Sequence, residues 1–350
     1  MNIDVSKVES LRYDDYFKKS TFIVLETLPE SLIGEVSKLY MTDSFIIIFD
    51  KKQMAIMLFD IKGNFIRQIG KKGSAPDEYT FFNDIQFERE TSLIYAHERY
   101  RNSIFTYNLD GELINKTPKI AIDFNSFCKT KFGYWVYSCF NTKNNPLGYN
   151  LMLLDEKLEK VKSSYFPQKK FVNVSDEPAF IQDELGIPYF FYPSSNIIYK
   201  LVEDNPIPWC RLDFGDKTMP YEKIVEIGSY EEYDRLVADK KFLGDISGFK
   251  VGNSIASFSF RETGFGIATK TYYCYFNFAQ NKVKVIQNPF IEGMDYPVEA
   301  KVLSVLNKSF VYSISLNVCS DDSFFSLSDQ LAKPISRESN PILVIADLKE

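Results

Sequence analysis

A basic, glycine-rich loop is the segment of this sequence that most resembles a ligand-binding site. It reads GKKGS at 70–74 and follows an apolar strand. A phosphate cradle has the form G-x-x-x-x-G-K-[ST] between a strand and a helix. In this chain the glycine spacing is shorter, and Pro76 and a β pattern follow in place of a helix. We therefore predict a connector between strands, with a ligand-binding face as the alternative. The candidate binding groups in that case are Lys71, Lys72, Glu78 and Tyr79.

Five carboxylates recur near the start of segments that we expect to be equivalent inner strands. If they converge, they could hold Ca²⁺ through oxygen ligands, or bind a cationic or hydroxyl-rich ligand. The alternative is that each is a solvated acid at the start of a strand. The five residues are Glu35, Asp84, Asp123, Asp245 and Glu299. Calcium is the only cofactor that the sequence suggests.

The chain has one histidine, His97. A catalytic zinc site uses about three protein ligands, often several of them histidines. A Ser-His-Asp triad would have to use this same residue, and there is no G-x-S-x-G elbow. His97 could act alone as a general base, but a histidine without catalytic function is the simpler interpretation. We therefore predict no catalytic residues.

A hairpin pattern repeats along the chain and must position these residues. FDIKGNFI at 59–66 returns as YNLDGELI at 107–114, and MLLDEKLEKV follows at 152–161. Each has an apolar strand, a polar turn and a second strand, as in a β-hairpin. Later echoes lie at 197–207 and 273–286. The last apolar residues before the turns are Ile61, Leu109, Leu154, Leu201, Phe278 and Leu348.

The spacing of these turns, 48, 45, 47, 77 and 70 residues, is typical of β-propeller blades with insertions in the later units. Blade one reads as four strands, A to D from the inside outward, over 33–41, 44–50, 55–61 and 65–70. The chain ends at a C strand, whereas a spare strand lies at about 21–27. We predict one all-β domain over 1–350, a six-bladed propeller in which the N-terminal strand completes the last blade and closes the ring.

Several segments resemble one family. VLETLPESLIGEVSKL, FDIKGNFIRQIGKKGSAPDEY, RLDFGDKTMP and SNPILVIADLK look like the bacterial secreted six-bladed β-propellers, which are often lipoproteins and are related in shape to NHL-repeat propellers. The resemblance spans nearly the whole chain and implies an extracytoplasmic location, in the periplasm or at the cell surface. The family tends to have Gly-x-Gly-Pro-Gly-Glu-Tyr in the basic loop, where this chain has Ala75 and Asp77 in place of two glycines.

Composition limits the remaining function classes. The net charge is −6 and the basic residues are scattered, which argues against nucleic acid as a partner. No apolar stretch is long enough to cross a bilayer, and the first residues, MNIDVSKVES, lack the apolar segment of a signal peptide. The five cysteines form no CxxC pair, and we expect mostly buried thiols.

Two long connections could border a ligand. Residues 221–243 have apolar spacings that suit one or two amphipathic helices, a helical insertion between blades four and five. Residues 164–196 are rich in aromatics, which could stack on sugar rings or pack in the core. The functional interpretation of the first connection is a lid or rim of a ligand site. The alternative is an insertion that only packs against the surface of the propeller.

Taken together, these features predict a non-catalytic, monomeric binding propeller that recognises a glycan or a protein partner. The predicted binding face carries the connections from strand D of one blade to strand A of the next. The alternative is a metal-dependent hydrolase or lyase of the calcium type, with the five carboxylates at the channel mouth. Convergence of those carboxylates would separate the two hypotheses.

Overall fold

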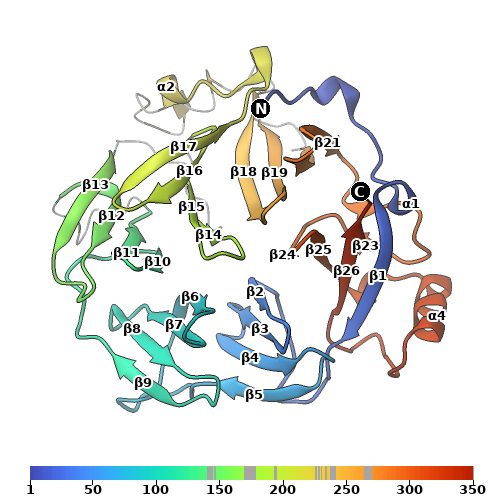
Figure 1. Cartoon of the computed structure of the whole chain (residues 1–350), viewed down its shortest axis with the longest axis horizontal. Coiled ribbons are helices and arrows are strands. Elements are labelled where there is room, and N and C mark those ends of the chain that lie inside the picture. The colour runs from blue at the N-terminus through green and yellow to red at the C-terminus, as the bar shows by residue number, and fades with distance from the viewer. Residues whose placement is uncertain are drawn as a thin grey trace.

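The computed structural model describes residues 1–139, 145, 147–168, 179–192, 195–224, 227, 229, 231–232, 235–236, 242–263 and 270–349. Within these residues the strands form six four-stranded antiparallel sheets and a two-stranded ribbon. The sheets surround a central channel like the blades of a propeller (Figure 1). The prediction of an all-β, six-bladed propeller is therefore confirmed at the level of the fold.

The strands of each blade are ordered from the innermost strand outward. Blade one comprises β2 (Lys38–Met41), β3 (Phe45–Asp50), β4 (Ala55–Asp60) and β5 (Phe65–Ile69). Blade two comprises β6 (Phe82–Glu88), β7 (Leu93–Glu98), β8 (Ser103–Tyr107) and β9 (Leu113–Lys116). Blade three comprises β10 (Ser126–Thr130), β11 (Gly133–Tyr137), β12 (Tyr149–Leu154) and β13 (Val161–Pro167).

The remaining blades follow the same plan. Blade four comprises β14 (Phe180–Gln182), β15 (Pro188–Phe191), β16 (Ile197–Val202) and β17 (Asn205–Arg211). Blade five comprises β18 (Phe242–Val251), β19 (Ile255–Thr263), β20 (Thr271–Asn277) and β21 (Lys282–Ile286). Blade six comprises β24 (Ser304–Leu306), β25 (Ser309–Ile314), β26 (Ile342–Leu348) and β1 (Phe17–Val24), and the separate ribbon comprises β22 (Phe290–Ile291) and β23 (Val298–Glu299).

In blade six, β1 is hydrogen-bonded to β26 in antiparallel register, with Thr21 opposite Ile345. The two strands come from opposite ends of the chain and lie side by side (Figure 1). β1 begins and ends a few residues before the predicted strand at 21–27, because the sequence pattern marks an apolar stretch and not the limits of its pairing.

Helices are few and short in the described part of the chain. They are the 3₁₀ turns η1 (Val5–Lys7), η2 (Gly215–Lys217) and η3 (Leu316–Val318), with α1 (Tyr13–Tyr16), α2 (Tyr221–Ile224) and α4 (Asp321–Gln330). None of these described helices has the length and apolar character that crossing a bilayer requires. Of the predicted insertion at 221–243, most residues after α2 lie outside the described residues.

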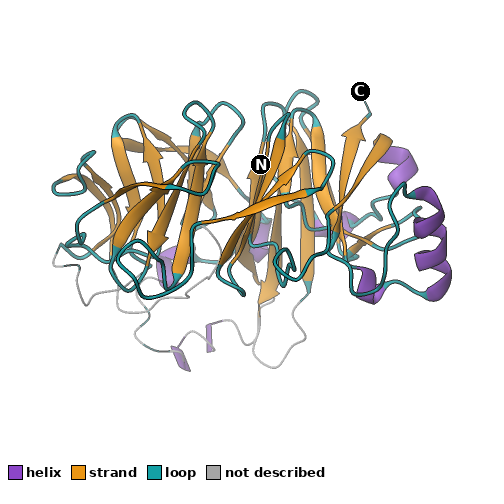
Figure 2. Cartoon of the chain, turned by 90° about the horizontal axis from the view of Figure 1, so that it is seen from below, coloured by secondary structure: helices purple, strands orange, loops and turns teal. Residues whose placement is uncertain are grey.

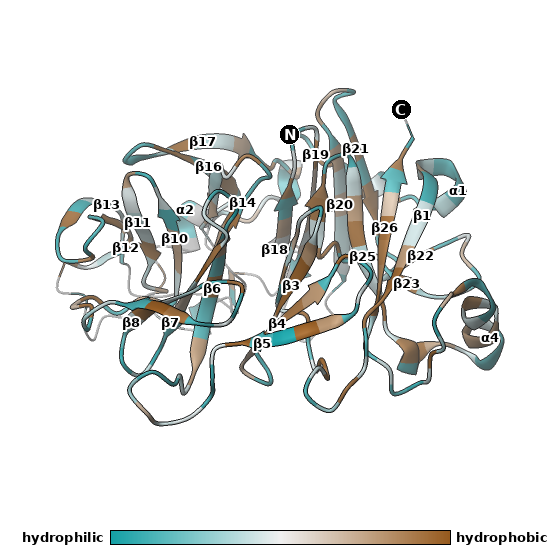
Figure 3. Ribbon diagram, turned by 60° about the horizontal axis from the view of Figure 1, so that its bottom comes forward, coloured by the Kyte–Doolittle hydropathy of each residue, from teal (hydrophilic) through white to brown (hydrophobic). Residues whose placement is uncertain are grey.

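The hydrophobic core is divided among the six interfaces between neighbouring blades. Each of six buried clusters takes residues mainly from two consecutive blades. In β3, Ile46 and Ile48 pack against blade six, whereas Ile47 and Phe49 pack against blade two. Because successive side chains point to opposite faces of a strand, a strand that is covered on both faces becomes a continuous apolar run. Figure 3 shows this hydropathy pattern along the strands.

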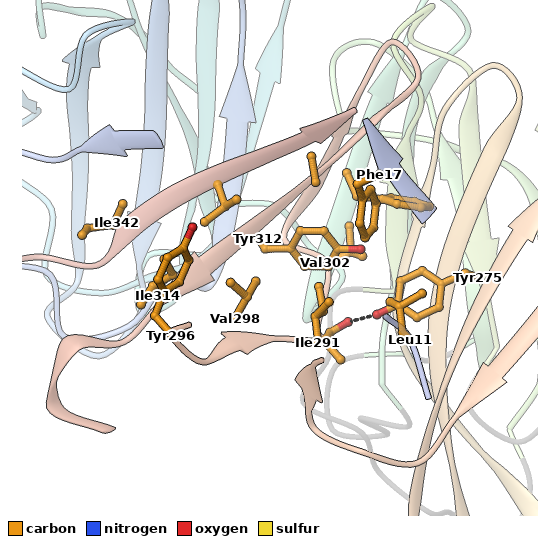
Figure 4. Packing of buried hydrophobic residues seen from close by; sticks show 14 of the residues in the cluster. Leu11, Phe17, Tyr275, Ile291, Tyr296, Val298, Val302, Tyr312, Ile314 and Ile342 are labelled. Carbon is orange, nitrogen blue, oxygen red and sulfur yellow. Dashed lines mark hydrogen bonds between the residues drawn. The ribbon is translucent and has the colours of Figure 1, made fainter. Parts of the chain in front are cut away.

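The interface between blades five and six is the largest of these clusters (Figure 4). Phe17 of β1 lies edge-on to Tyr312 of β25, with ring centroids 6.0 Å apart. Tyr275 of β20 donates a hydrogen bond to the carbonyl oxygen of Ala300. The N-terminal strand is thus packed into an interface as well as hydrogen-bonded at an edge.

The strands run between two faces of the ring, and the turns and loops lie on these faces (Figure 2). One face, which we call the connector face, carries the connections from strand D of one blade to strand A of the next. The other, which we call the A–B face, carries the turns between strands A and B.

Candidate functional site

The basic loop of the sequence is the connector between β5 and β6, and it folds back on itself. The Gly73 amide donates to the Tyr79 carbonyl at 2.8 Å, and the Tyr79 amide donates to the Lys71 carbonyl at 2.9 Å. Gly70 has φ +71°, and a Cβ atom there would lie 2.9 Å from the ring of Tyr107. Glycine is needed at this point both for the left-handed backbone and for the close approach of the tyrosine.

The charged side chains of this connector bind largely to the connector itself. Lys71 Nζ lies 2.6 Å from Glu78 Oε1, and the Ala75 amide donates to Glu78 Oε2 at 3.0 Å. The hydrogen bond between Lys71 and Glu78 lowers the pKa of the carboxyl and raises the pKa of the amine. Lys72 Nζ lies 3.4 Å from the carbonyl oxygen of Gln53. The lysine side chains are at the surface, whereas Glu78 holds the loop in shape.

Tyr79, the fourth predicted binding group of this loop, is buried. Its ring stacks on Phe82 with centroids 3.9 Å apart. Its hydroxyl donates to the Met54 carbonyl at 2.9 Å and accepts from Gln68 Nε2 at 2.9 Å. This geometry ties the connector to blade one and leaves the ring no face for a ligand.

We expect Tyr79→Phe to lower the free energy of unfolding by about 1 kcal/mol, because the part-buried Gln68 amide and Met54 carbonyl lose their hydrogen-bond partner. Urea unfolding measures the loss. Tyr100→Phe is the matched control, since Tyr100 is largely exposed and should change stability by less than about 0.5 kcal/mol. Equal stability of the two variants would show that the hydroxyl of Tyr79 does not hold the connector.

Asp84 is the predicted channel carboxylate with the most complete set of partners. It lies in β6 and is buried. Its Oδ1 is 2.5 Å from Lys38 Nζ of blade one, and its Oδ2 accepts from the Phe127 amide of blade three at 3.1 Å. Burial opposes the charged form of Lys38, but Asp84 raises the pKa of the amine above its ordinary value. This carboxylate therefore joins three blades.

The other four predicted carboxylates have separate surroundings. Glu35 is exposed and precedes β2, Asp123 Oδ1 accepts from Asn102 Nδ2 at 3.1 Å, and Glu299 lies in β23, where Oε1 accepts from Ser315 at 3.3 Å. Asp245 is in β18, and its side chain is outside the described part. Among the described residues, no group of three or more His, Cys, Asp or Glu side chains could hold a metal ion.

A cavity of about 920 Å³ lies in the central channel. Strand A of every blade contributes at least one residue to its wall, and none of the nine residues named as binding groups of the loop or the channel mouth lies in this wall. One lining residue from each blade, in order, is Lys38, Gln86, Lys129, Gln182, Lys250 and Ser304. The signal that could have found them is their common place on the innermost strands, but their residue types show no shared motif.

Polar groups on the cavity wall are bonded across blades. Gln86 Nε2 donates to the Lys129 carbonyl at 3.0 Å and to Gln182 Oε1 at 2.9 Å. Lys129 Nζ lies 2.5 Å from Glu88 Oε1. Burial favours the neutral form of the Glu88 carboxyl, but the hydrogen bonds from Lys129 and Thr91 hold the pKa of Glu88 below its ordinary value. The wall therefore combines apolar side chains such as Leu39, Phe87 and Val305 with charged groups that are in part neutralised within it.

The rim of the cavity is on the A–B face. Its lining includes the turns that follow β6, β10 and β14, and none of the nine predicted binding residues. The hairpin of β14 and β15 extends toward the middle of the ring (Figure 1). Asp183 Oδ1 fixes its tip by accepting from the amides of Leu185 and Ile187, at 3.0 and 2.9 Å. Glu184 accepts a hydrogen bond from the amide of Asn307 in blade six.

Residues 164–196 are not the single long connection that the sequence predicted, because they include the end of β13 and all of β14 and β15. Their aromatics mostly belong to the core. Phe180, Tyr189, Phe190, Phe191 and Tyr192 are all buried, so their rings offer no exposed face to a sugar. Phe166 stacks on Tyr192 with centroids 4.7 Å apart, and Phe171 is outside the described residues. All five cysteines are free thiols, with Cys128, Cys274 and Cys319 buried.

Comparisons with known proteins identify the fold and a family whose function is unknown. The family profile that matches residues 1–347 is described as a domain of unknown function, DUF4934. A putative exported protein from Bacteroides fragilis has a solved structure with a TM-score of 0.79 and 14% identity, over 100% of this chain and 99% of that one. A DUF4221 family member from Bacteroides vulgatus gives a TM-score of 0.55 and 9% identity, over 95% and 97%. No curated protein matches significantly.

Proposed function

This chain belongs to the DUF4934 family, and from that premise we propose that it is a non-catalytic binding propeller. The observation that carries the proposal is the cavity of about 920 Å³, built by the innermost strands of all six blades. Its volume is within the range of ligand sites. Because the cavity opens on the A–B face, we place the binding site there. The connector face stays a prediction that the sequence alone supports.

We propose a segment of a partner protein as the ligand. Most aromatic rings of the wall, among them Trp135 and Phe180, are buried, which is unfavourable for stacking on a sugar. The rim instead exposes apolar side chains, and Leu185 at the hairpin tip is 71% exposed. An apolar contact surrounded by polar groups is the usual form of a protein interaction site. The internal ion pairs of the wall also disfavour a highly charged ligand.

A selection from a display library of short linear peptides, compared with a panel of neutral oligosaccharides, tests this proposal. Peptides that bind the native chain should lose affinity by at least about tenfold for Leu185→Asp, which corresponds to about 1.4 kcal/mol. Ile207→Asp is the matched control, since Ile207 is an exposed apolar residue of the same blade that does not line the cavity. Equal binding to both variants, or binding of oligosaccharides alone, would overturn the proposal.

The alternative is a calcium-dependent hydrolase or lyase at the connector-face mouth of the channel. It would need Glu35, Asp123, Asp245 and Glu299 to act together with Asp84, which already has a lysine partner. Thermal unfolding with Ca²⁺ and then EDTA distinguishes the two functions. Calcium at about 100 times its dissociation constant would add about 2.7 kcal/mol of stability, reversed by EDTA. Such a shift would favour the alternative.

We also propose an extracytoplasmic location, which rests on the sequence resemblance and on the name of the similar exported protein. The lipoprotein character and the kinship to NHL-repeat propellers rest on the resemblance alone. For the fold, we propose that pairing of β1 with β26 is what closes the ring, and that residues 221–243 form a helical insertion between blades four and five.

A further inference from the structure

The side-chain amide of Asn102 joins His97 to the connector between β9 and β10. Asn102 Nδ2 donates to the carbonyls of Ile120 and Ile122, at 2.8 and 3.0 Å, and to Asp123 Oδ1 at 3.1 Å. Three acceptors on one side require the NH₂ group to face the connector. The amide oxygen must therefore face the imidazole, and it lies 2.9 Å from His97 Nε2.

This arrangement fixes the proton on the imidazole. Because Asn102 Oδ1 can only accept, Nε2 of His97 carries the hydrogen and Nδ1 carries the lone pair. Nδ1 is buried and has no hydrogen-bond partner among the described residues. A proton added to Nδ1 would create a buried cation without a hydrogen-bond acceptor there, which is costly.

The surroundings of His97 give no full compensation for such a charge. Its ring is buried and stacks on Phe124 of the connector, with centroids 4.1 Å apart. The charged groups that act on its pKa are Arg99 in the next turn and Asp123 in the connector, and Asp84 is its register partner on β6. Burial lowers the pKa of His97 to about 4, and Arg99 acts in the same direction, whereas Asn102 and Asp123 oppose the shift.

We propose that His97, Asn102 and the connector at 117–125 form an acid-sensitive latch: protonation of His97 releases the connector from blade two. The released segment then exposes the imidazole to water, where the cation is solvated. The connector also contacts blade two through Asn83, which donates to Asn125 Oδ1 at 2.8 Å. Release therefore changes the connector face. The cavity rim, where we place the binding site, lies on the opposite face and is not changed.

The expected effect follows from linkage. In the closed state the imidazole has a lowered pKa of about 4, and in the open state it regains its ordinary value of 6.5. The closed latch is therefore favoured above pH 6.5 and is progressively lost as the pH falls toward 4. Between pH 7 and pH 5 the opening equilibrium should rise by about 20-fold.

Hydrogen exchange of the Ile120 amide, which donates to the Asn102 carbonyl at 2.8 Å, measures the opening. After correction for the intrinsic exchange rate, its protection should fall by about 20-fold between pH 7 and pH 5. His97→Gln cannot gain the charge, and its Ile120 protection should stay nearly constant. The Tyr79 amide, in the β5–β6 connector, is the internal control and should not follow this pH dependence.

Equal acid dependence in His97→Gln and the native chain would overturn the latch, as would equal loss of protection in β8, which indicates global unfolding. If His97→Gln does not fold, NMR titration of the single imidazole decides the question. We expect a pKa near 4 in the native chain and a value closer to 6.5 in Asn102→Ala, whose connector is released at neutral pH. A native imidazole that titrates near 6.5 would contradict the proposal.

Discussion

Replacement of Asp84 by alanine is expected to lower the free energy of unfolding by about 3 to 5 kcal/mol, the cost of breaking a buried ion pair. Lys38 Nζ, 2.5 Å from the carboxylate, is largely buried and would lose its counter-charge. The Phe127 amide would also lose its acceptor. The loss should appear in urea unfolding as a lower midpoint with an unchanged slope.

The control for this prediction is Asp110→Ala. Arg67 Nη1 and Asp110 Oδ1 form an exposed pair at 3.5 Å, and such pairs contribute about 0 to 1 kcal/mol. A second variant, Lys38→Met with Asp84→Leu, removes both charges and should recover part of the loss. If Asp84→Ala is no less stable than Asp110→Ala, then Asp84 does not join the blades, and its availability as a binding carboxylate must be reconsidered.

Phe17→Ala is expected to lower the free energy of unfolding by about 3 to 5 kcal/mol, as usual for a buried phenylalanine. The Phe17 ring contacts Tyr13, Tyr16 and Tyr312, with centroids 5.1, 5.8 and 6.0 Å away. Truncation would leave a cavity in the interface between blades five and six, beside β1 (Figure 4). If β1 closes the ring, hydrogen exchange should show that β26 amides such as Ile345 lose protection first.

Lys19→Ala lies in the same strand with an exposed side chain, and it should change stability by less than about 0.5 kcal/mol. It separates the effect of the core contact from any effect on strand propensity. A cost of Phe17→Ala below about 1 kcal/mol, or unchanged protection of β26, would show that the ring stays closed without this contact.

The repeat of hairpins, and with it the six-bladed fold, could be read from the sequence because turns are set by local chemistry. At the first hairpin, Asp60 Oδ1 accepts from the amides of Lys62 and Asn64, at 2.9 and 2.8 Å. Gly63 has φ +81°, and a Cβ atom there would lie 2.3 Å from the carbonyl oxygen of Val24. Such residues specify a turn almost regardless of the rest of the chain.

The candidate site could not be read in the same way. Tyr79 and Glu78 were predicted as binding groups from the loop composition, yet their partners Gln68, Met54 and Lys71 show them in structural contacts. The local sequence pattern predicts which loop or strand a residue lies in. Whether the side chain is buried depends on its contacts with residues that are distant in the sequence, and the local pattern gives no information on these.

The sequence by itself determined the strands, the turns and the number of blades, since these depend on residues a few positions apart. Only the tertiary structure decided which polar groups are bonded to other residues of the chain and where a cavity is left. Lys38 meets Asp84, Gln86 meets Gln182 and Glu184 meets Asn307. These partners are separated by 46, 96 and 123 positions, and they come together because the propeller fold brings six innermost strands around one channel.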